Sequence, residues 1–345
     1  MVRTVRVAKA RRSPNMNAGL CRAVRRAAWA SALAVWLVAG WAMPASAQSY
    51  PDRPIKLIVP FAAGGPLDIV GRTLGDKLAA ALKQPIIIEN RVGAGGNIGT
   101  ELAAKSQPDG YTLLLVLSGT LVANPAVFSK LPFDPKADFE PISLLTTTSQ
   151  MLVVHPSVPV NTAAEFVAHA KKNPITYAHA GPGSGGHLAM GYLQLQAGFS
   201  GTPVPYRGNA PLMNDLAAGQ VQSGFIASAG AIPHVRAGRL KGLAISSEKR
   251  SPQAPNVPTV AEAGFPQMKL NTWFVLMAPA KTPPAILTVL ERAVQNAVKQ
   301  PDLREKWLSM DITPFGTDGV EAKRLLAADT VLWADIVKRA NMQQR

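Results

Sequence analysis

The chain has 345 residues, 47% of them hydrophobic, which is enough for two cores of ordinary size. Its formal charge of +15 is concentrated at the start: residues 1–47 hold eight Lys or Arg and no acid, so 15 minus 8 leaves +7 for the rest. In that remainder basic residues are scattered among acids, with no basic run and no interleaved aromatics, which argues against a nucleic-acid-binding protein.

Residues 1–47 predict a signal peptide. An apolar run of 17 residues, 27–43, follows the basic stretch, and Ala45, Ser46 and Ala47 form a small-residue cleavage site. We expect cleavage after Ala47 and export to the periplasm, by the general route or the twin-arginine route. A retained membrane anchor is the competing interpretation of the apolar run, and Met16 is an alternative start.

The only cysteine, Cys21, lies in this segment, ahead of the apolar run. The predicted mature chain therefore has no thiol. This excludes a disulfide, a thiolate nucleophile and a cysteine metal ligand.

Strand and helix patterns alternate along the rest of the chain. The predicted strands, rich in Ile, Val, Leu and Tyr, are residues 55–59, 85–89, 111–117, 151–155, 176–180, 221–226, 240–246 and 273–278. Thr162 and Glu165 form a capping box, and residues 283–299 and 320–339 are long amphipathic stretches. Such alternation predicts doubly wound, mainly parallel sheets.

Residues 55–72 are typical of a strand, a glycine-rich loop and a helix. Gly64 and Gly65 allow a ligand to approach the backbone closely, and we expect Asp68 to be the helix N-cap. The unpaired N–H groups and the positive end of the helix dipole would then face the loop. The stretch predicts an anion site.

Two further loops follow predicted strands. Ser118 and Thr120 come at the carboxyl end of one strand, where an open α/β sheet binds its ligand. In the second half, residues 180–187 repeat the strand, glycine-rich bend and helix, and they contain Gly181, Ser184 and Gly185. A simple turn with a helix cap is the structural alternative for each.

Catalytic and cofactor sites are weakly indicated. Ser184 with His187 would suit an acyl hydrolase, but the GxSxG elbow and an orienting acid are missing. The glycine loop at residues 91–99 has Ile98 where a dinucleotide fingerprint needs its third glycine, and the remaining histidines lack metal-ligand spacing. We predict no catalytic residue, no cofactor and no metal.

Several longer stretches, in order, resemble the Bug family, the substrate-binding proteins of tripartite tricarboxylate transporters. They include YPDRPIKLIVPFAAGGPLDIVGRTLGDKL, ENRVGAGGNIGTELAAKSQPDGYTLLL, LPFDPKADFEPISLL, PYRGNAP, KRSPQAPNVPTVAEAGFP and TWFVLMAPAKTP. The resemblance covers residue 50 to the C-terminus.

The resemblance implies a type II periplasmic-binding-protein fold with two lobes around a central cleft. The expected division is residues 48–148 and 273–345 for the first lobe and 149–272 for the second, with crossings near Thr148 and Thr272. The ligand-binding residues that it implies, together with the loops above, are Phe61, Ala63, Gly64, Gly65, Leu67, Asp68, Ser118, Thr120, Gly181, Ser184, Gly185, Tyr206, Gly208 and Ile226. Arg207 is expected at the rim.

The chain departs from the family pattern at two of these positions. Leu67 stands where many relatives have Thr, and Ile226 stands in place of a polar residue. The resemblance implies a monomeric, non-catalytic binding protein that captures a small carboxylate and delivers it to membrane permease subunits. A receptor that passes its ligand to a signalling partner, and a hydrolase using Ser184, are the alternatives.

Overall fold

The computed structural model describes residues 50–268 and 270–343. The predicted signal peptide, residues 1–47, lies outside the described residues.

Ten strands are assigned in this part of the chain, most of them where the sequence predicts them. They are β1 Ile55–Val59, β2 Ile86–Asn90, β3 Thr112–Leu117, β4 Phe139–Val154, β5 Thr176–His179, β6 Thr202–Pro205, β7 Ser223–Ala227, β8 Lys241–Ile245, β9 Asn271–Pro279 and β10 Ile312–Pro314. The sequence does not predict the short strands β6 and β10 or the first three quarters of β4, residues 139–150.

Helices follow most of the strands, which is the alternation expected of an α/β fold. They are α2 Pro66–Leu82, the 3-10 turn η1 Ala94–Gly96, α3 Asn97–Ala104, α4 Ser118–Val122, α5 Asn124–Val127, α6 Ala163–Ala170, α7 Gly185–Ala197, α8 Asn209–Ala217, α9 Ser228–Arg236, α10 Pro284–Val298, α11 Pro301–Ser309 and α12 Gly319–Arg339. The predicted capping box is present, because Thr162 accepts from the Glu165 N–H and Glu165 accepts from the Asn161 N–H.

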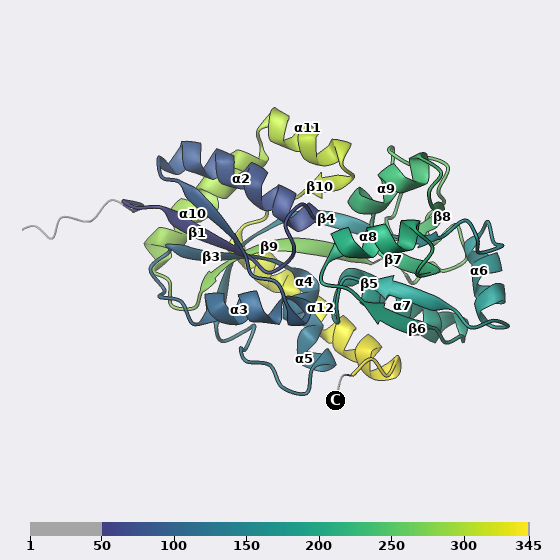
Figure 1. Ribbon diagram of the computed structural model, residues 1–345. Helices are drawn as coiled ribbons and strands as arrows, with labels where there is room; N and C mark the ends of the chain where they lie inside the picture. The colour runs from purple at the N-terminus through teal and green to yellow at the C-terminus, as the bar shows by residue number, and fades with distance from the viewer. Residues whose placement is uncertain (1–49, 269, 344–345) are drawn as a thin grey trace, which may run out of the picture. The chain divides into compact units, whose positions relative to one another are not determined.

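Two parallel groups of strands are joined by two antiparallel ones. The order is β2-β1-β3-β9-β4-β7-β5-β6, with β8 and β10 also paired to β4. β1 is parallel to β2 and β3, and β5 is parallel to β6 and β7, whereas β4 and β9 pair antiparallel with their neighbours. In Figure 1, β4 and β9 run from one group to the other.

β4 changes partners along its length. From Phe139 to Ser149 it pairs with β9, and from Gln150 to Val154 it pairs with β7. Its 16 residues therefore belong to both groups of strands. Polar residues such as Thr148 and Gln150 interrupt the earlier part of β4. The sequence pattern therefore predicts a strand only in its last, apolar part.

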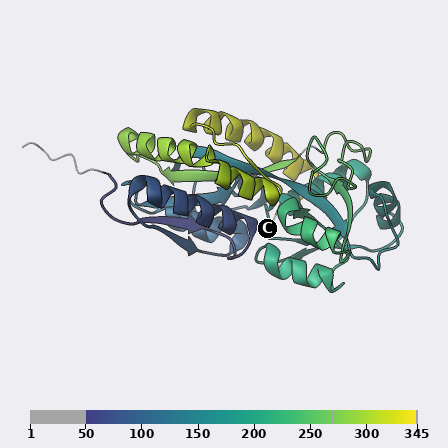
Figure 2. The ribbon, with the colours of Figure 1, turned by 90° about the horizontal axis from the view of Figure 1, so that it is seen from above.

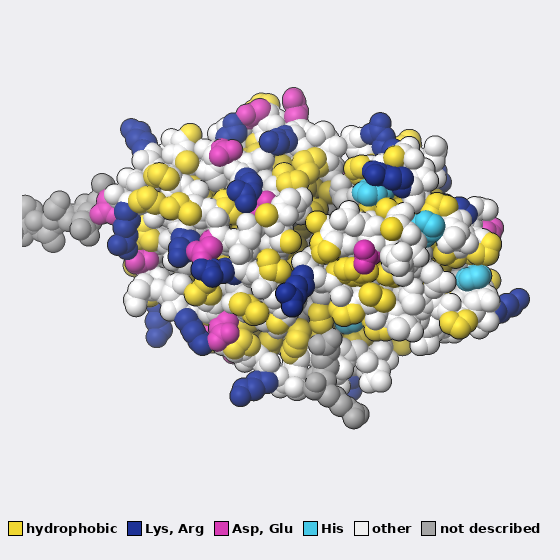
Figure 3. All heavy atoms as spheres, viewed as in Figure 1, with side chains coloured by type: hydrophobic (Ala, Val, Ile, Leu, Met, Phe, Trp, Pro, Cys, Tyr) yellow, Lys and Arg dark blue, Asp and Glu magenta, His cyan; other side chains and the backbone are white. Residues whose placement is uncertain are grey.

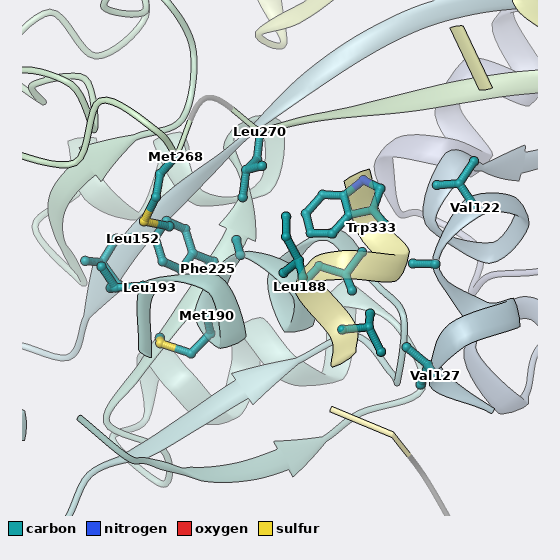
Figure 4. Packing of buried hydrophobic residues seen from close by; sticks show 14 of the residues in the cluster. Val122, Val127, Leu152, Leu188, Met190, Leu193, Phe225, Met268, Leu270 and Trp333 are labelled. Atoms are coloured by element: carbon teal, nitrogen blue, oxygen red, sulfur yellow. The ribbon is translucent and has the colours of Figure 1, made fainter. Parts of the chain in front are cut away.

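Three clusters of buried apolar side chains support these elements. One lies between β1, β3 and the helices α2, α10 and α11, where α2 and α10 are side by side (Figure 2). A second lies between β7, α8 and α9. The largest cluster joins both groups of strands: Trp333 of α12 lies between Leu188 of α7 and Val122 of α4 (Figure 4). The C-terminal helix thus packs on elements from both halves of the chain.

Candidate functional site

The loop after β1 leads into a helix whose start has no side-chain cap. α2 begins at Pro66 with Gly65 as its N-cap residue. Proline is favoured at this first position because its missing N–H would have no partner there. The following N–H groups, of Leu67 and Asp68, have no acceptor within the helix, and the dipole adds partial positive charge. The start of α2 is suited to an anion.

The buried carboxylate of Asp68 stabilises the conformation of this loop through hydrogen bonds. Its Oδ2 accepts from the Gly64 N–H and from Arg72 Nε, each at 2.9 Å, and its Oδ1 accepts from Asn90 Nδ2 at 3.0 Å. Burial alone would raise the pKa of Asp68, but the hydrogen bonds from Arg72, Gly64 and Asn90 outweigh it and keep the pKa below its ordinary value. The prediction that Asp68 is the N-cap is wrong, because the proline starts the helix earlier.

Ser184 is the N-cap residue of α7, which packs against β5 and β7. Its Oγ accepts from the His187 N–H, and Nδ1 of His187 accepts from the Gly183 N–H at 3.2 Å. Burial, together with the stacked ring of His179, lowers the pKa of His187 to about 3, so that this ring is neutral. No hydrogen bond joins the Ser184 hydroxyl to the His187 ring among the described residues. The pair shapes a loop and lacks the geometry of a hydrolase.

Two more helices begin nearby without side-chain caps. Gly208 is the N-cap residue of α8, and Ala227 is that of α9. Together with the starts of α2 and α7, these residues border one cavity, which we call the central pocket. Four helix N-termini therefore face the same space, and their partial positive charges add there.

The central pocket contains about 580 Å³ of empty space, counting solvent at its mouth. It is lined by Phe61, Ala62, Gly65, Pro66, Leu67, Leu117, Thr148, Gln150, Ala180, Ser184, Gly185, Gly186, Gly208, Asn209, Phe225, Ala227, Thr272 and Phe274. None of these side chains is charged. Figure 3 shows the surface hollowed near the middle, where α2 and α8 begin in Figure 1.

Polar side chains from β4 and β9 form one wall of the central pocket. Thr148, Gln150 and Thr272 are each less than 7% exposed. Nε2 of Gln150 donates to Thr272 Oγ1 at 3.2 Å, and the Thr148 hydroxyl lies 3.5 Å from that of Ser228. These groups add hydrogen-bonding capacity without net charge.

Loops from the two halves of the chain meet around the pocket. A Cβ added to Gly208 would lie 3.3 Å from that of Ala62. A Cβ added to Gly95 would lie 2.3 Å from the Pro182 carbonyl oxygen, so the backbones there are in direct contact. The pocket is therefore covered on two sides.

A second, outer pocket adjoins the first and shares Phe61 and Ala180 with it. It holds Tyr206, whose hydroxyl donates to Asp215 at 2.8 Å, and this burial and bonding raise the pKa of Tyr206 to about 12. Among the described residues that line it, Arg207 carries the charge, and its side chain is exposed.

The structure brings many of the predicted site residues together. Those that line the central pocket are Phe61, Gly65, Leu67, Ser184, Gly185 and Gly208, and those that line the outer pocket are Phe61, Gly181 and Tyr206. Ala63 and Gly64 are exposed in the first loop, where the Gly64 N–H is bonded to Asp68.

Besides Asp68, whose carboxylate bonds within the first loop, and the loop residues Ala63 and Gly64, three predicted residues line neither pocket. Ser118 Oγ accepts from the Trp273 N–H, and Thr120 Oγ1 donates to the Gly95 carbonyl, so both hydroxyls are used within the protein. Ile226 packs in the cluster between β7 and α8 and is 1% exposed. Because side chains alternate along a strand, the pocket is lined by its neighbours Phe225 and Ala227.

Sequence reasoning missed most of the wall from β4 and β9. Thr148 and Thr272 were expected as crossing points only, and Gln150 was not singled out. A run of five polar residues, 146–150, between apolar stretches is the signal that could have found Thr148 and Gln150, which share one face of the strand. Asn209 and Phe274, which also line the central pocket, carried no such signal.

Between residues 50 and 343, position 269 apart, no helix is long and apolar enough to cross a bilayer. In the same part of the chain, no group of three or more His, Cys, Asp or Glu residues could hold a metal ion.

An uncharged pocket that is bordered by helix N-termini, on a sheet built from two parallel groups, is a site of the kind that can bind a small anion. The family comparison agrees. Residues 70–342 match the model of the tripartite tricarboxylate transporter family receptor, TctC, and the chain belongs to this family of periplasmic solute-binding proteins. Family members and structural neighbours are receptors and not enzymes.

Relatives and solved structures cover nearly the whole chain. The protein is 35% identical to BugT of Bordetella pertussis over 303 residues, which span 87% of this chain and 93% of BugT. It is similar to MatC of Rhodopseudomonas palustris with bound malate, at a TM-score of 0.79 and 34% identity over 84% of this chain and 100% of MatC. A second R. palustris protein, solved with adipate, gives a TM-score of 0.81 and 32% identity over 85% of this chain and 98% of its own.

Proposed function

We propose that this protein captures a small carboxylate in the central pocket and delivers it to the permease subunits of a tripartite membrane transporter. The observation that carries the proposal is the meeting of four helix N-termini around a pocket with no charged side chain. Such a pocket attracts an anion through backbone N–H groups and dipoles. The malate and adipate in the two R. palustris proteins are small carboxylates.

Export is part of the proposal. The signal peptide, residues 1–47, would be removed after Ala47, leaving a periplasmic monomer that begins at Gln48. Residues 48–148 and 273–345 form one lobe and residues 149–272 the other. The lobes separate and close about β4 and β9, since only a few residues of these two strands need to move.

The ligand is expected to have one carboxylate and an apolar body. Leu67, Phe61 and Phe225 line the pocket, and they give no partner to a second ionised group. Burying a polar group without a partner costs about 1–3 kcal/mol, whereas an apolar body gains from the same wall. Citrate should bind at least tenfold more weakly than an apolar monocarboxylate.

The proposal is tested by thermal-shift screening of purified mature protein against mono-, di- and tricarboxylates, aromatic acids and amino acids. A ligand at a hundred times its dissociation constant should add about 2.7 kcal/mol to the free energy of unfolding. The bound compound should be recovered unchanged. Turnover that Ser184→Ala abolishes would replace the proposal with a hydrolase, and the absence of any stabilising carboxylate would refute it.

Two substitutions test how the anion is held. Gly65→Val adds a branched side chain at the start of α2, beside the expected anion position, and should weaken binding strongly. Arg207→Ala, at the exposed rim, should change the affinity little. Both affinities are measured by calorimetry on folded variants. If Arg207→Ala weakens binding more than Gly65→Val does, a side-chain salt bridge holds the anion instead.

An assay of carboxylate uptake by cells distinguishes a role in transport from a role in signalling. A strain without this protein should lose uptake of the identified carboxylate, and the protein in trans should restore it. Normal uptake, with loss of a transcriptional response to the same compound, would favour a receptor for a signalling partner.

A further inference from the structure

The outer pocket is built by both halves of the chain. Its walls from the first half are residues 60–61 and 92–96, and those from the second half are residues 180–182 and 205–207. A Cβ added to Gly95 would lie 2.3 Å from the Pro182 carbonyl oxygen, so the two walls touch. The proposed division places Gly95 and Pro182 in different lobes. On that division, the outer pocket takes this form only while the lobes are closed.

Arg207 brings an unpaired positive charge to this pocket. Its side chain is exposed, and no hydrogen bond or ion pair joins it to another residue in the described part of the chain. By contrast, Arg72 and Arg91 of the first half pair with Asp68 and Glu89. Arg207 lines the outer pocket and not the central one. Its guanidinium is therefore available to a carboxylate from outside the protein, which it can bind through two parallel hydrogen bonds.

Exposed apolar side chains gather beside the same pocket. Val92 lines the pocket and is exposed, and Ile98 and Leu102 are exposed one turn apart on α3. A Cβ added to Gly93, which also lines the pocket, would lie 2.4 Å from Ile98 Cδ1. We call Val92, Ile98 and Leu102 the apolar lip. Exposed apolar groups that adjoin a pocket and a charged rim are typical of protein–protein interaction sites.

We propose that the outer pocket and the apolar lip form the docking surface for the permease subunits, and that a permease loop places an acidic side chain against Arg207. The inference rests on the proposed function and names the site of its partner. The apolar lip belongs to one proposed lobe and Arg207 to the other, so the surface is complete only when the lobes are closed on the ligand. The permease thereby distinguishes a loaded receptor from an empty one.

The charge of this surface fits one kind of partner. A basic loop would be repelled by Arg207, whereas an acidic residue flanked by apolar side chains matches both the charge and the lip. A membrane surface would require a cluster of basic residues, and among the described residues that line the pocket Arg207 alone is charged.

The test compares uptake with ligand affinity in variants of the mature protein. Uptake is measured in proteoliposomes that contain the permease subunits, with the receptor added at increasing concentration. The substrate is the radiolabelled form of the screened carboxylate that stabilises the unmodified protein most, with malate, adipate and benzoate tried first. Affinity for the same compound is measured by calorimetry. A docking residue should change uptake and leave the affinity unchanged.

Arg207→Glu tests the charge. A like charge against the permease carboxylate should raise the receptor concentration for half-maximal uptake by about tenfold or more. Arg239→Glu is the matched control and should leave uptake unchanged. Arg239 is also exposed in the second half, has no hydrogen bond or ion pair with another described residue, and lines neither pocket.

Ile98→Glu tests the apolar lip. Ile98 is the second residue of α3, where an acidic side chain is favoured by the helix dipole, so the variant should fold. Its carboxylate should repel the acidic permease loop and weaken uptake by a similar factor. Val320→Glu is the matched control, because Val320 is the second residue of α12 and is 81% exposed. Leu102→Glu gives the same test should Ile98→Glu fail to fold.

The outcomes separate the inference from the proposed function. Normal uptake with either Arg207→Glu or Ile98→Glu overturns the inference and leaves the proposed function standing. The same holds if these variants lose affinity for the carboxylate, because the surface would then belong to the ligand site, or if the control variants lose uptake equally. If no carboxylate stabilises the unmodified protein, the proposed function fails, and the inference fails with it.

Discussion

Gly183→Ala is expected to block closure of the central pocket. Gly183 has a positive φ of 71°, and a Cβ added to it would lie 1.6 Å from Oδ1 of Asn124. In the proposed division these two residues belong to different lobes. The alanine variant would therefore meet an obstacle in the closed form that is absent when the lobes separate.

The size of this effect follows from the hydrogen bonds that the Asn124 side chain would lose. Its Nδ2 donates to the Gly95 carbonyl at 3.3 Å and to Asn97 Oδ1. Turning the side chain away from the new methyl group breaks both bonds, each contributing about 0.5–1.5 kcal/mol net. The closed form is then weakened by about 1–3 kcal/mol, which corresponds to roughly a 5- to 150-fold loss of ligand affinity.

Gly198→Ala is the matched control. Gly198 lies at the other end of α7 with a φ of 69°, and an added Cβ would have nothing within 4 Å. In both variants an alanine takes a left-handed backbone conformation. This should lower the free energy of unfolding, measured by urea denaturation, by about 1 kcal/mol. Calorimetry should show that only Gly183→Ala loses ligand affinity. Equal affinity in the two variants would refute the steric argument, and partial rescue by Asn124→Ala in the Gly183→Ala background would support it.

Three further outcomes are expected. Asp68→Asn should lower the free energy of unfolding by about 1–3 kcal/mol at neutral pH; because the folded-state pKa of Asp68 lies below the unfolded value of about 3.9, the difference from the unmodified protein should shrink as the pH falls below about 4 in urea titrations. Trp307→Phe should cost about 1–3 kcal/mol without changing ligand affinity, since the fully buried indole donates to Thr73 Oγ1 at 2.9 Å, and an unchanged urea midpoint would contradict this. The intact mass of periplasmic protein should begin at Gln48, and a product that retains residues 27–43 would indicate a membrane anchor instead.

The sequence predicts the fold well where one physical signal dominates. β1 and the start of its loop follow from a β-branched run that ends at Pro60, and the capping box at Thr162 fixes the start of α6. β4 is harder, because a run of Thr, Ser and Gln at residues 146–150 interrupts its apolar side chains, and because it pairs with a strand more than 120 residues away. Local patterns do not reveal such long-range pairing.

The sequence predicts the loop residues of the central pocket but not the residues of β4 and β9 that form its wall. Glycine loops indicate close backbone approach, which is why Gly65 and Gly185 are predicted from residue type, whereas Gly208 is predicted from the family resemblance; all three line the central pocket. The predicted residue Ile226 is one position away from the strand residues that line the pocket. A shift of one position along a strand moves a side chain to the opposite face of the sheet. Only the observed pairing of Ile226 with Met151 places it in the core and assigns Phe225 and Ala227 to the pocket.

The use of backbone donors also explains how affinity is tied to closure. One of the four helix N-termini, that of α2, belongs to the first proposed lobe, and those of α7, α8 and α9 belong to the second. A lysine or arginine on either lobe would hold an anion in the open form by itself. Helix ends act only over about one turn, so an anion bound to one lobe loses the contribution of the other until the loops at Ala62 and Gly208 meet. In the proposed function the anion would therefore be bound most tightly in the closed form, where all four helix ends act on it, and opening the lobes would weaken its binding.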